Sequence, residues 1–507
     1  MNYPALLSFA CGFASLSLEI LWVRLYSFAH LSTPAAFGFV LMAYLLGIAL
    51  GAQAGARACR RADSDEQLWR YSVTALWLSA LLTLVLPALF GAMASIFLSN
   101  AMLDLLVMAV ASSVLAFVFP IAHHLGTQNL AGQQGQRFAL VYTSNVMGAA
   151  LGPLVTGYVL LHSLSLQQSF LVICAVQCSA AVFFTLALQV KPRHGLLAGA
   201  GTLLVGGVAL AGTLLDPHAL VQSVNQTGTR ADTVIENRHG IITIFQEGVG
   251  STDHAVFGGN VYDGRTNLNP EVNSNGLDRP LLLAALQPQP RRVLMVGLSI
   301  GTWLALVNEF PGVEQVDVVE INPGYLQAAQ AYPAQARALQ DPRAHVVVDD
   351  ARRWLRQHPD KQYDLIIMNT TWHWRSNITL LLSTEFLQLM QSHMAPGAVL
   401  SFNATGSADA FYTASKVFAH AYRYANFVYA ADFDFRARKD TAATRQLYQS
   451  LQLGGTPLFA PHSPSIEKFV TKPFFTIDAV QKSADRPLEQ ITDHNMVTEF
   501  KYGKSLY

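Results

Sequence analysis

Residues 291–297 read RRVLMVG, and residues 298–310 continue as LSIGTWLALVNEF. The first run is short and apolar, as in a buried strand, and the second has the composition of a helix. Between them lies a turn from Gly297 to Gly301, in which Ser299 stands where the usual pattern has its middle glycine. Glycines at such a turn let the backbone bend sharply and approach a ligand closely. This stretch therefore predicts the first strand and helix of a ligand-binding α/β domain.

Two further strands are expected next, and both end in acidic residues. VEQVDVVEIN (313–322) carries Glu320, about 20 residues beyond the glycine turn, where an acid commonly binds ribose hydroxyls. AHVVVDDARRWL (344–355) places Asp349 and Asp350 at a strand end. A lone acid in this position is often the N-cap of the following helix.

A fourth strand is expected in YDLIIMNTTWHW (363–374), which reaches its end at Asn369. A later strand, GAVLSFNAT (397–405), follows a predicted loop at Pro396 and Gly397. Strands that alternate with helical stretches indicate a parallel sheet, and ligands bind at the carboxyl ends of its strands. The order and spacing of these segments together predict a nucleoside-binding α/β domain.

Upstream of this domain, IENRHGIITIFQEG (235–248) and DHAVFGGNVYDG (253–264) are β-rich runs with glycine turns. They predict a small antiparallel β subdomain over residues 232–285, followed by the Rossmann-like domain at 286–507.

The first 216 residues have a different composition. Only 14 of the 66 charged residues of the chain lie there. A membrane-spanning helix needs about 20 mostly apolar residues. Seven runs meet this requirement, approximately at 4–29, 33–56, 68–94, 102–122, 138–161, 166–190 and 195–215. We therefore expect a helical membrane domain at 1–216 and a polar linker at 217–231.

Basic residues in short loops mark the cytoplasmic side of a membrane protein. Here they follow the second, fourth and sixth runs, as Arg57, Arg60, Arg61, Arg70, Arg137, Lys191 and Arg193. This pattern puts the N-terminus in the cytoplasm, and seven crossings would put the C-terminal domain outside it. If the run at 195–215 does not cross completely, that domain returns to the cytoplasm. The sequence leaves both arrangements open.

Small residues recur at a spacing of four in two of these runs, as Gly47, Gly51 and Gly55, and as Gly148 and Gly152. This spacing lets helix backbones approach closely, which predicts a tightly packed bundle. The alternative is that the glycines line a pathway for a substrate.

Other classes of function find little support in the composition. The formal net charge is zero, and basic residues do not cluster with aromatic ones, so we expect no nucleic-acid partner. All four cysteines lie in the membrane half, and the sequence shows no metal-ligand cluster.

The β subdomain followed by VLMVGLSIGT, VDVVEINP, VVVDDARRWL and YDLIIMN resembles the spermidine synthases, or polyamine aminopropyltransferases, over residues 232–430. The membrane half is also similar to that of bacterial fused spermidine synthase-like proteins. The similar segments are FACGFASLSLEILWVRLYSF (9–28) and AYLLGIALGA (43–52).

The resemblance implies a methyltransferase-type Rossmann fold that binds decarboxylated S-adenosylmethionine, or S-adenosylmethionine, as donor, without a metal. It implies a nucleoside pocket at the glycine turn, lined by Gly297, Ser299 and Gly301. In this pocket Glu320 would hold the ribose hydroxyls, and Asp350 would contact the adenine with Ala351 beside it.

The chain departs from the family at the amine site. Asn369 and Trp372 stand where the family has two aspartates, and an amide cannot accept the proton of the attacking amine. The segment 267–282 keeps no clear match to the family's acidic, tyrosine-bearing amine-binding segment. We therefore expect an acceptor other than plain putrescine.

The candidate catalytic residues are Asn369, Asp349 and His373, and Tyr363 near the fourth strand is considered as a further replacement. Trp372 and Trp374 flank His373 and could cage a sulfonium or ammonium ion. The alternative is a tryptophan-rich loop that rests on the membrane or on the bundle of membrane helices.

Two functions remain open. The first is a membrane-bound transferase that acts on a small-molecule amine or other acceptor. The second is a catalytically inactive binding or transport module. Either would be a multi-pass protein of the bacterial plasma membrane, in contact with the lipid bilayer and with a homo-oligomer as a possible assembly.

Overall fold

The computed structural model describes residues 2–96, 100–128, 134–189, 193–248 and 250–507. Lys191, which was used above to orient the chain, lies outside this described part. The chain forms two compact units. One contains Met1–Arg230, Glu236–Arg238 and Leu506–Tyr507, and the other contains Ala231–Ile235 and His239–Ser505. The expected fold class, a multi-helix apolar region and a Rossmann-like domain with a small β subdomain, is confirmed.

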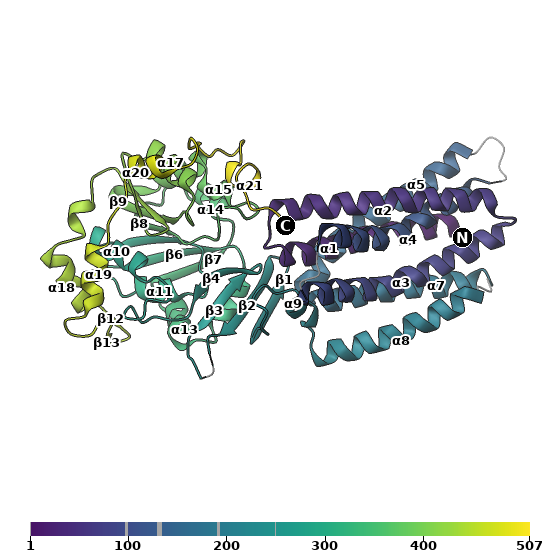
Figure 1. Ribbon diagram of the computed structural model, residues 1–507, viewed down its shortest axis with the longest axis horizontal. Helices are drawn as coiled ribbons and strands as arrows, with labels where there is room; N and C mark the ends of the chain where they lie inside the picture. Colours follow the sequence, from purple (N-terminus) through teal and green to yellow (C-terminus); the bar gives the residue numbers. More distant parts are fainter. Residues whose placement is uncertain (1, 97–99, 129–133, 190–192, 249) are drawn as a thin grey trace. The chain divides into compact units, whose positions relative to one another are not determined.

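The first unit consists mainly of long apolar helices (Figure 1). They are α1 (Tyr3–Ala29), α2 (Pro34–Arg61), α3 (Asp65–Ser95), α4 (Ala101–Thr127), α5 (Gln134–Val155), α6 (Leu161–Ser163), α7 (Leu166–Ala187), α8 (Arg193–Leu215) and α9 (Ala219–Ser223). A π-helical turn at Thr156–Leu160 joins α5 to α6. Six segments of the described chain are long and apolar enough to cross a membrane. The seventh predicted run corresponds to α8, in which Gly199–Leu215 is apolar.

Polar residues at the loop ends begin several of these helices. The Ser64 hydroxyl accepts from the Gln67 backbone N–H, and the Asn100 side chain accepts from the N–H groups of the first turn of α4. Ser165 forms a reciprocal capping box with Gln168 at the start of α7. Because these caps satisfy N–H groups that have no partner within the helix, they fix where each helix begins.

The glycine-rich face of α2 lies directly against the backbone of α4. A Cβ atom on Gly47 would lie 2.2 Å from the Ala109 carbonyl oxygen, and one on Gly51 would lie 2.0 Å from the Ser113 carbonyl oxygen. Gly55 approaches α4 in the same way. These contacts confirm the tight packing that the glycine spacing predicts.

The same arrangement joins α1 to α5. A Cβ atom on Gly148 would lie 2.1 Å from the Phe9 carbonyl oxygen, and one on Gly152 would lie 2.4 Å from the Phe13 carbonyl oxygen. From the α1 side, a Cβ atom on Gly12 would meet the Asn145 carbonyl oxygen at 2.3 Å. Two helix pairs are therefore held in backbone contact by glycines.

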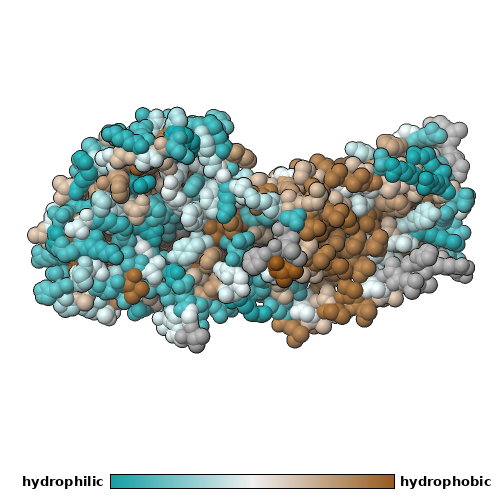
Figure 2. Space-filling model, in the orientation of Figure 1, coloured by the Kyte–Doolittle hydropathy of each residue, from teal (hydrophilic) through white to brown (hydrophobic). Residues whose placement is uncertain are grey.

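Large apolar side chains cover the outer surface of the helical unit. On the face seen in Figure 2, hydrophobic residues form a broad area over these helices. Those of α2 include Phe37, Met42, Leu45, Leu46 and Leu50. An exposed apolar surface of this extent fits contact with lipid rather than with water.

The second unit begins with the expected small antiparallel sheet. Its strands, in spatial order, are β1 (Thr233–Asn237), β2 (Gly240–Gln246), β3 (His254–Gly258) and β4 (Val261–Arg265). The following helix, α10 (Asp278–Leu286), contributes its leucines to the core of the larger sheet.

A seven-stranded sheet of order β10-β11-β9-β8-β5-β6-β7 forms the centre of the second unit. Its strands are β5 (Arg292–Val296), β6 (Gln315–Glu320), β7 (Ala344–Val348), β8 (Tyr363–Met368), β9 (Met394–Asn403), β10 (His420–Tyr424) and β11 (Phe427–Ala431). Strands β5 to β9 run parallel, and β10 and β11 form an antiparallel edge.

One boundary differs from the prediction. Pro396 and Gly397 lie inside β9 rather than in a loop before it. The pairing of β9 with β8 jumps from Met394 to Val399, so the proline stands in an irregular stretch that needs no regular ladder hydrogen bond.

Helices cover both faces of this sheet, as Figure 1 shows. On one face α10, α11 (Thr302–Val307) and α13 (Pro333–Gln340) pack against Val293 and Met295 of β5. The other face is covered by α14 (Ala351–Gln357), α16 (Thr384–Ser392), α17 (Ala408–Val417) and α20 (Ile477–Ser483). The alternation of β5 side chains between these two cores is what a parallel strand buried on both faces requires.

The remaining short elements lie around this layer structure. They are α12 (Gly324–Ala329), α15 (Thr379–Leu382), α18 (Ala442–Ser450), α19 (Pro464–Thr471), α21 (Val497–Phe500), β12 (Gln452–Leu453) and β13 (Thr456–Pro457). Strand β5 has β6 as its neighbour on one side and β8 on the other, so the order of the strands reverses at β5. A parallel sheet binds its ligands at such a switch in strand order, at the carboxyl ends of the strands.

The contact between α2 and α4 can be tested with a pair of glycine substitutions. Gly51→Ala forces the two backbones apart and is expected to lower stability by about 1–3 kcal/mol. Gly38→Ala on the same helix has no atom within 4 Å of the added methyl group. It should be neutral or stabilising, because alanine favours a helix over glycine by about 1 kcal/mol. The thermal unfolding midpoints of the detergent-solubilised chain check this, and equal shifts in both variants would contradict it.

Candidate active site

The turn after β5 has the backbone conformation of a glycine turn at three positions. Gly297 and Gly301 have φ of +84° and +82°, and Ser299 has a φ of +49°, in the left-handed region that favours glycine. The Ser299 hydroxyl donates to the Asp263 carbonyl oxygen at 3.1 Å. The turn therefore keeps the expected shape although its sequence lacks the middle glycine.

Gly297 also brings two strand ends together. A Cβ atom on this residue would lie 2.6 Å from the Asn369 carbonyl oxygen, and the Asn369 N–H donates to the Val296 carbonyl at 3.0 Å. Only glycine allows this approach, which holds the end of β8 against the turn.

Glu320 ends β6 next to the same turn and is only 4% exposed. Its carboxylate accepts the Leu298 N–H at 2.7 Å and the Asn322 N–H at 2.8 Å. Burial raises the pKa of Glu320 to about 7, and the negative charge of Asp263 adds to this while the backbone hydrogen bonds oppose it. Each carboxylate oxygen keeps further lone-pair capacity, so the group can still accept hydrogen bonds from sugar hydroxyls.

The acidic pair after β7 lies at the same edge. The Asp349 N–H donates to the Glu320 carbonyl oxygen at 3.1 Å. Asp349 accepts from the Arg353 guanidinium at 2.6 Å, and Asp350 caps α14 by accepting the Arg353 N–H at 2.8 Å. Ala351 is buried at the start of that helix. The structure thus brings the predicted nucleoside residues into one row along β5, β6 and β7.

A cavity of about 280 Å³ lies beside the middle of β4 and at the ends of β8 and β9. It is lined by Tyr262, Asp263, Gly264, Asn275, Arg279, Trp303, Asn369, Thr370, Thr371, Trp372, Asn403, Thr405, Gly406 and Asn426. Of the predicted catalytic residues Asn369, Asp349 and His373, only Asn369 is among the described lining residues.

His373 lies behind the wall of this cavity. The hydroxyl oxygen of Thr405, a residue that lines the cavity, accepts a hydrogen bond from the His373 backbone N–H at 3.0 Å. The same oxygen lies 2.7 Å from Nδ1 of the His373 ring. Burial lowers the pKa of His373, so the imidazole is neutral at pH 7. The His373 ring thus contacts the Thr405 hydroxyl and is not among the described residues that line the cavity.

Tyr363 lies at the opposite end of β8 from Asn369. Its hydroxyl donates to the Asp317 carboxylate at 2.7 Å, where Lys361 also binds. The considered role of Tyr363 as a replacement catalyst is thus wrong, because this residue begins the strand at whose far end the cavity lies.

The two tryptophans beside His373 have different surroundings. Their ring centroids lie 6.0 Å apart, but only Trp372 belongs to the described cavity wall. The Trp374 ring instead faces the Lys504 ammonium at 5.1 Å. The pair therefore contributes one aromatic wall to the cavity, and its two rings do not enclose it.

Sequence reasoning missed Asp263, which lies in the middle of β4 and lines the cavity. Its carboxylate accepts the Tyr325 hydroxyl at 2.5 Å. Burial raises the pKa of Asp263, and the Tyr325 hydrogen bond and the positive charge of Arg375 oppose that shift. The available signal was a carboxylate directly before Gly264, in a run that was predicted only as a strand and a turn.

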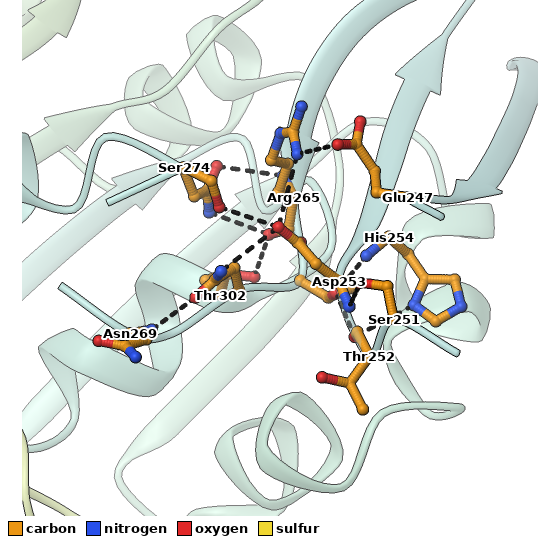
Figure 3. Close-up of polar contacts among 12 residues, drawn as sticks. Glu247, Ser251, Thr252, Asp253, His254, Arg265, Asn269, Ser274 and Thr302 are labelled. Atoms are coloured by element: carbon orange, nitrogen blue, oxygen red, sulfur yellow. Dashed lines mark hydrogen bonds and ion pairs between the residues drawn. The ribbon is translucent and has the colours of Figure 1, made fainter. Parts of the chain in front are cut away.

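A second polar network holds the segment between β4 and α10, which supplies Asn275 to the cavity and leads into Arg279 in the first turn of α10. Figure 3 shows its centre at Asp253, whose carboxylate accepts from Ser274 at 2.9 Å and pairs with Arg265 at 3.4 Å. The Arg265 carbonyl in turn accepts from Thr302 of α11 at 2.7 Å. These contacts tie the cavity wall to the helix that follows the glycine turn.

Comparison with known proteins places this site in context. Residues 282–424 match the family model of the spermine/spermidine synthase domain. The chain is 27% identical over 286 residues to the polyamine aminopropyltransferase of Mycobacterium tuberculosis. It is 28% identical over 289 residues to polyamine aminopropyltransferase 1 of Streptomyces coelicolor. Both alignments cover 54% of this chain and 52% of the relative, so the chain spans about half the length of the curated relatives it matches.

Among solved structures, the spermidine synthase from Thermotoga maritima aligns with a TM-score of 0.41 and 19% identity. The alignment covers 50% of this chain and 87% of that one. A spermidine synthase in complex with the transition-state analogue AdoDATO aligns with a TM-score of 0.42.

The raised pKa of Glu320 predicts how stability depends on pH. The unfolded chain releases this proton near pH 4.5, whereas the folded protein holds it to about pH 7. Between these values the folded state binds more protons, so the contribution of Glu320 to the free energy of unfolding falls as pH rises, by roughly 3 kcal/mol in all. Glu320→Gln, which mimics the protonated form, should therefore gain stability relative to the natural protein between pH 5 and 8.

Unfolding midpoints of the two proteins at matched pH values measure this gain. Glu314→Gln serves as the control, because that carboxylate is exposed and paired with Arg291. A midpoint difference for Glu320→Gln that stays constant from pH 5 to 8 would show that Glu320 does not titrate in this range.

Proposed function

Because the C-terminal domain of this chain belongs to the spermidine synthase family, we propose that the protein is a membrane-bound transferase of aminopropyl or related groups. Its donor is an S-adenosylmethionine-type nucleoside, with decarboxylated S-adenosylmethionine as the aminopropyl donor. The observation that carries this proposal is the row of Gly297, Glu320 and Asp350 beside a cavity that contains a carboxylate.

The donor binds along the ends of β5, β6 and β7. The turn of Gly297, Ser299 and Gly301 receives the nucleoside, and the Glu320 carboxylate accepts the ribose hydroxyls. Asp350 has one oxygen engaged as the helix cap, which leaves the other for the adenine amino group beside Ala351. The proposal involves no metal ion.

The reaction joins the acceptor nitrogen to the carbon beside the donor sulfonium. As the C–N bond forms, the C–S bond breaks, and its electron pair goes to sulfur to give a neutral thioether nucleoside. The attacking amine must lose a proton, which Asn369 cannot accept. We assign this role to Asp263, because it lines the cavity and its burial raises its pKa.

Calorimetric titration of the full-length protein in detergent tests donor binding. The ligands are decarboxylated S-adenosylmethionine, S-adenosylmethionine and methylthioadenosine. Glu320→Ala should weaken each about 10- to 100-fold, since a hydrogen bond to a charged group contributes about 1.5–3 kcal/mol. Glu314→Ala, an exposed glutamate removed from the site, should leave affinity unchanged. Failure of all three ligands to bind would overturn the transferase proposal.

A second candidate, a catalytically inactive binding module, is favoured by the contacts of α8. Thr202 of α8 donates to the Trp77 carbonyl of α3, and Thr213 near its end accepts from Gln167 at the start of α7. Helix α8 therefore returns along α7 to the level where α7 began. If it crosses the membrane, the arginine-rich loops and the α/β domain lie on opposite sides, away from cytosolic nucleosides.

The side of the membrane separates the two candidates. We propose a multi-pass protein of the bacterial plasma membrane, and the transferase requires an α/β domain in the cytoplasm, where adenosyl donors are made. It therefore predicts six complete crossings and a cytoplasmic C-terminus. Fusion after Tyr507 of green fluorescent protein should then give fluorescence, and fusion of alkaline phosphatase should give no activity. The reverse result would favour the inactive binding module.

A further inference from the structure

The charges in the cavity wall differ at its two sides. Of the described residues that line it, Asp263 and Arg279 carry charge, and four others, Asn275, Asn369, Asn403 and Asn426, carry amides. Arg375 lies near Asp263 and favours its ionised form. The Asp263 carboxylate is thus already balanced by a cation, whereas the Arg279 side of the cavity is positive.

The hydrogen-bond partners of Arg279 are all neutral, although the charge of the neighbouring Asp278 also acts on it. Its guanidinium donates to the Gly276 carbonyl at 2.9 Å, to the Asn275 carbonyl at 2.7 Å and to the Asn426 amide oxygen at 3.0 Å. The neighbouring Asp278 carboxylate is bound instead by Lys472 at 2.6 Å. A guanidinium has five N–H donors, so these three bonds leave donors for a ligand in the cavity.

Aromatic rings hold the guanidinium in place. Arg279 lies 5.3 Å from the Trp303 ring centroid and 5.1 Å from that of Phe427. Both contacts are of cation–π type and restrict the motion of the side chain. An arginine fixed in this way can bind a carboxylate without first losing side-chain freedom.

The amides beside Arg279 have a fixed orientation. Because Asn426 accepts from Arg279 through its oxygen, its nitrogen donates onward to the Asn403 oxygen at 2.9 Å. Asn403 in turn donates to the Thr370 carbonyl at 2.9 Å. The hydrogen bonds run from Arg279 through Asn426 and Asn403 to the Thr370 carbonyl. All of these acceptors are uncharged, so the positive charge of Arg279 is not neutralised by them.

We infer that the cavity binds an acceptor with an amino group at one end and a carboxylate at the other, and that Arg279 binds the carboxylate. This inference rests on the proposed transferase function and names its acceptor class. A diamine at neutral pH would place an ammonium group against Arg279, and like charges in a partly buried site repel strongly. An ω-amino acid places its ammonium near Asp263 and its carboxylate on the guanidinium fork.

The transfer step stays balanced with this acceptor. The ammonium gives a proton to the Asp263 carboxylate, and the neutral amine attacks the carbon beside the sulfonium. The C–S bond breaks with its electron pair on sulfur. The products are an N-(3-aminopropyl) amino acid and methylthioadenosine, and the acceptor carboxylate takes no part in bond making.

The test compares three acceptors of equal chain length on the full-length protein. They are 4-aminobutanoate, 1,4-diaminobutane and butylamine, each titrated calorimetrically with and without saturating methylthioadenosine. We expect 4-aminobutanoate to bind at least tenfold more tightly than 1,4-diaminobutane, with butylamine between them. Arg279→Gln should abolish this preference, and Arg279→Lys should keep part of it. Arg423→Gln, which removes a guanidinium over the Phe475 ring outside the cavity wall, should leave it unchanged.

The outcomes separate this inference from the proposed function. If methylthioadenosine and both forms of S-adenosylmethionine fail to bind, the transferase proposal fails, while the order of acceptor affinities still tests whether Arg279 selects a carboxylate. If methylthioadenosine binds but 1,4-diaminobutane binds as tightly as 4-aminobutanoate, or none of the acceptors binds, the inference is overturned. The inference is also overturned if Arg279→Gln has the unfolding midpoint of the natural protein and still binds 4-aminobutanoate more tightly than 1,4-diaminobutane. The order measured on the natural protein decides the matter even if Arg279→Gln does not fold.

Discussion

The hydrogen bond from the Leu298 backbone N–H to the Glu320 carboxylate joins the turn after β5 to the end of β6. Around this bond the carboxyl ends of β8, β5, β6 and β7 form one continuous edge. Gly297 contacts the end of β8 on one side, and the Asp349 N–H after β7 donates to the Glu320 carbonyl on the other. Burying a carboxylate is costly, and the two backbone N–H groups offset only part of that cost. The raised pKa of Glu320 is the consequence.

That edge divides into two regions of different chemistry. The region of β5, β6 and β7 presents carboxylates and backbone groups, which suit a neutral or cationic nucleoside with free hydroxyls. The region of β4, β8 and β9 presents amides, aromatic rings and the Arg279 guanidinium. Asp263 stands between the two regions, and it influences both, because its charge contributes to the pKa of Glu320 and it also lines the cavity.

The region of β5, β6 and β7 was predictable from the sequence because its residues follow one another strand by strand along the chain. The turn from Gly297, Glu320 about 20 residues later and the acids after β7 follow strand by strand. The cavity was not predictable, because Asp263 and Arg279 come from the small sheet and from α10, which meet only through tertiary packing. Tyr363 shows the converse case. It precedes Asn369 by a full strand, a separation of roughly 20 Å at about 3.3 Å per residue, so spacing alone argued against it.

The helices of the first unit and their glycine contacts were predicted from the sequence, whereas length and hydropathy alone do not decide whether α8 crosses a membrane. The backbone contacts of Gly51 with α4 and of Gly148 with α1 have a mechanical meaning. Helices that touch through main-chain atoms cannot slide past or rotate against one another without colliding, because no side chain can yield between them. The pairs α2–α4 and α1–α5 must each move as a rigid body, and any change of shape in the bundle has to occur along the seams between these pairs.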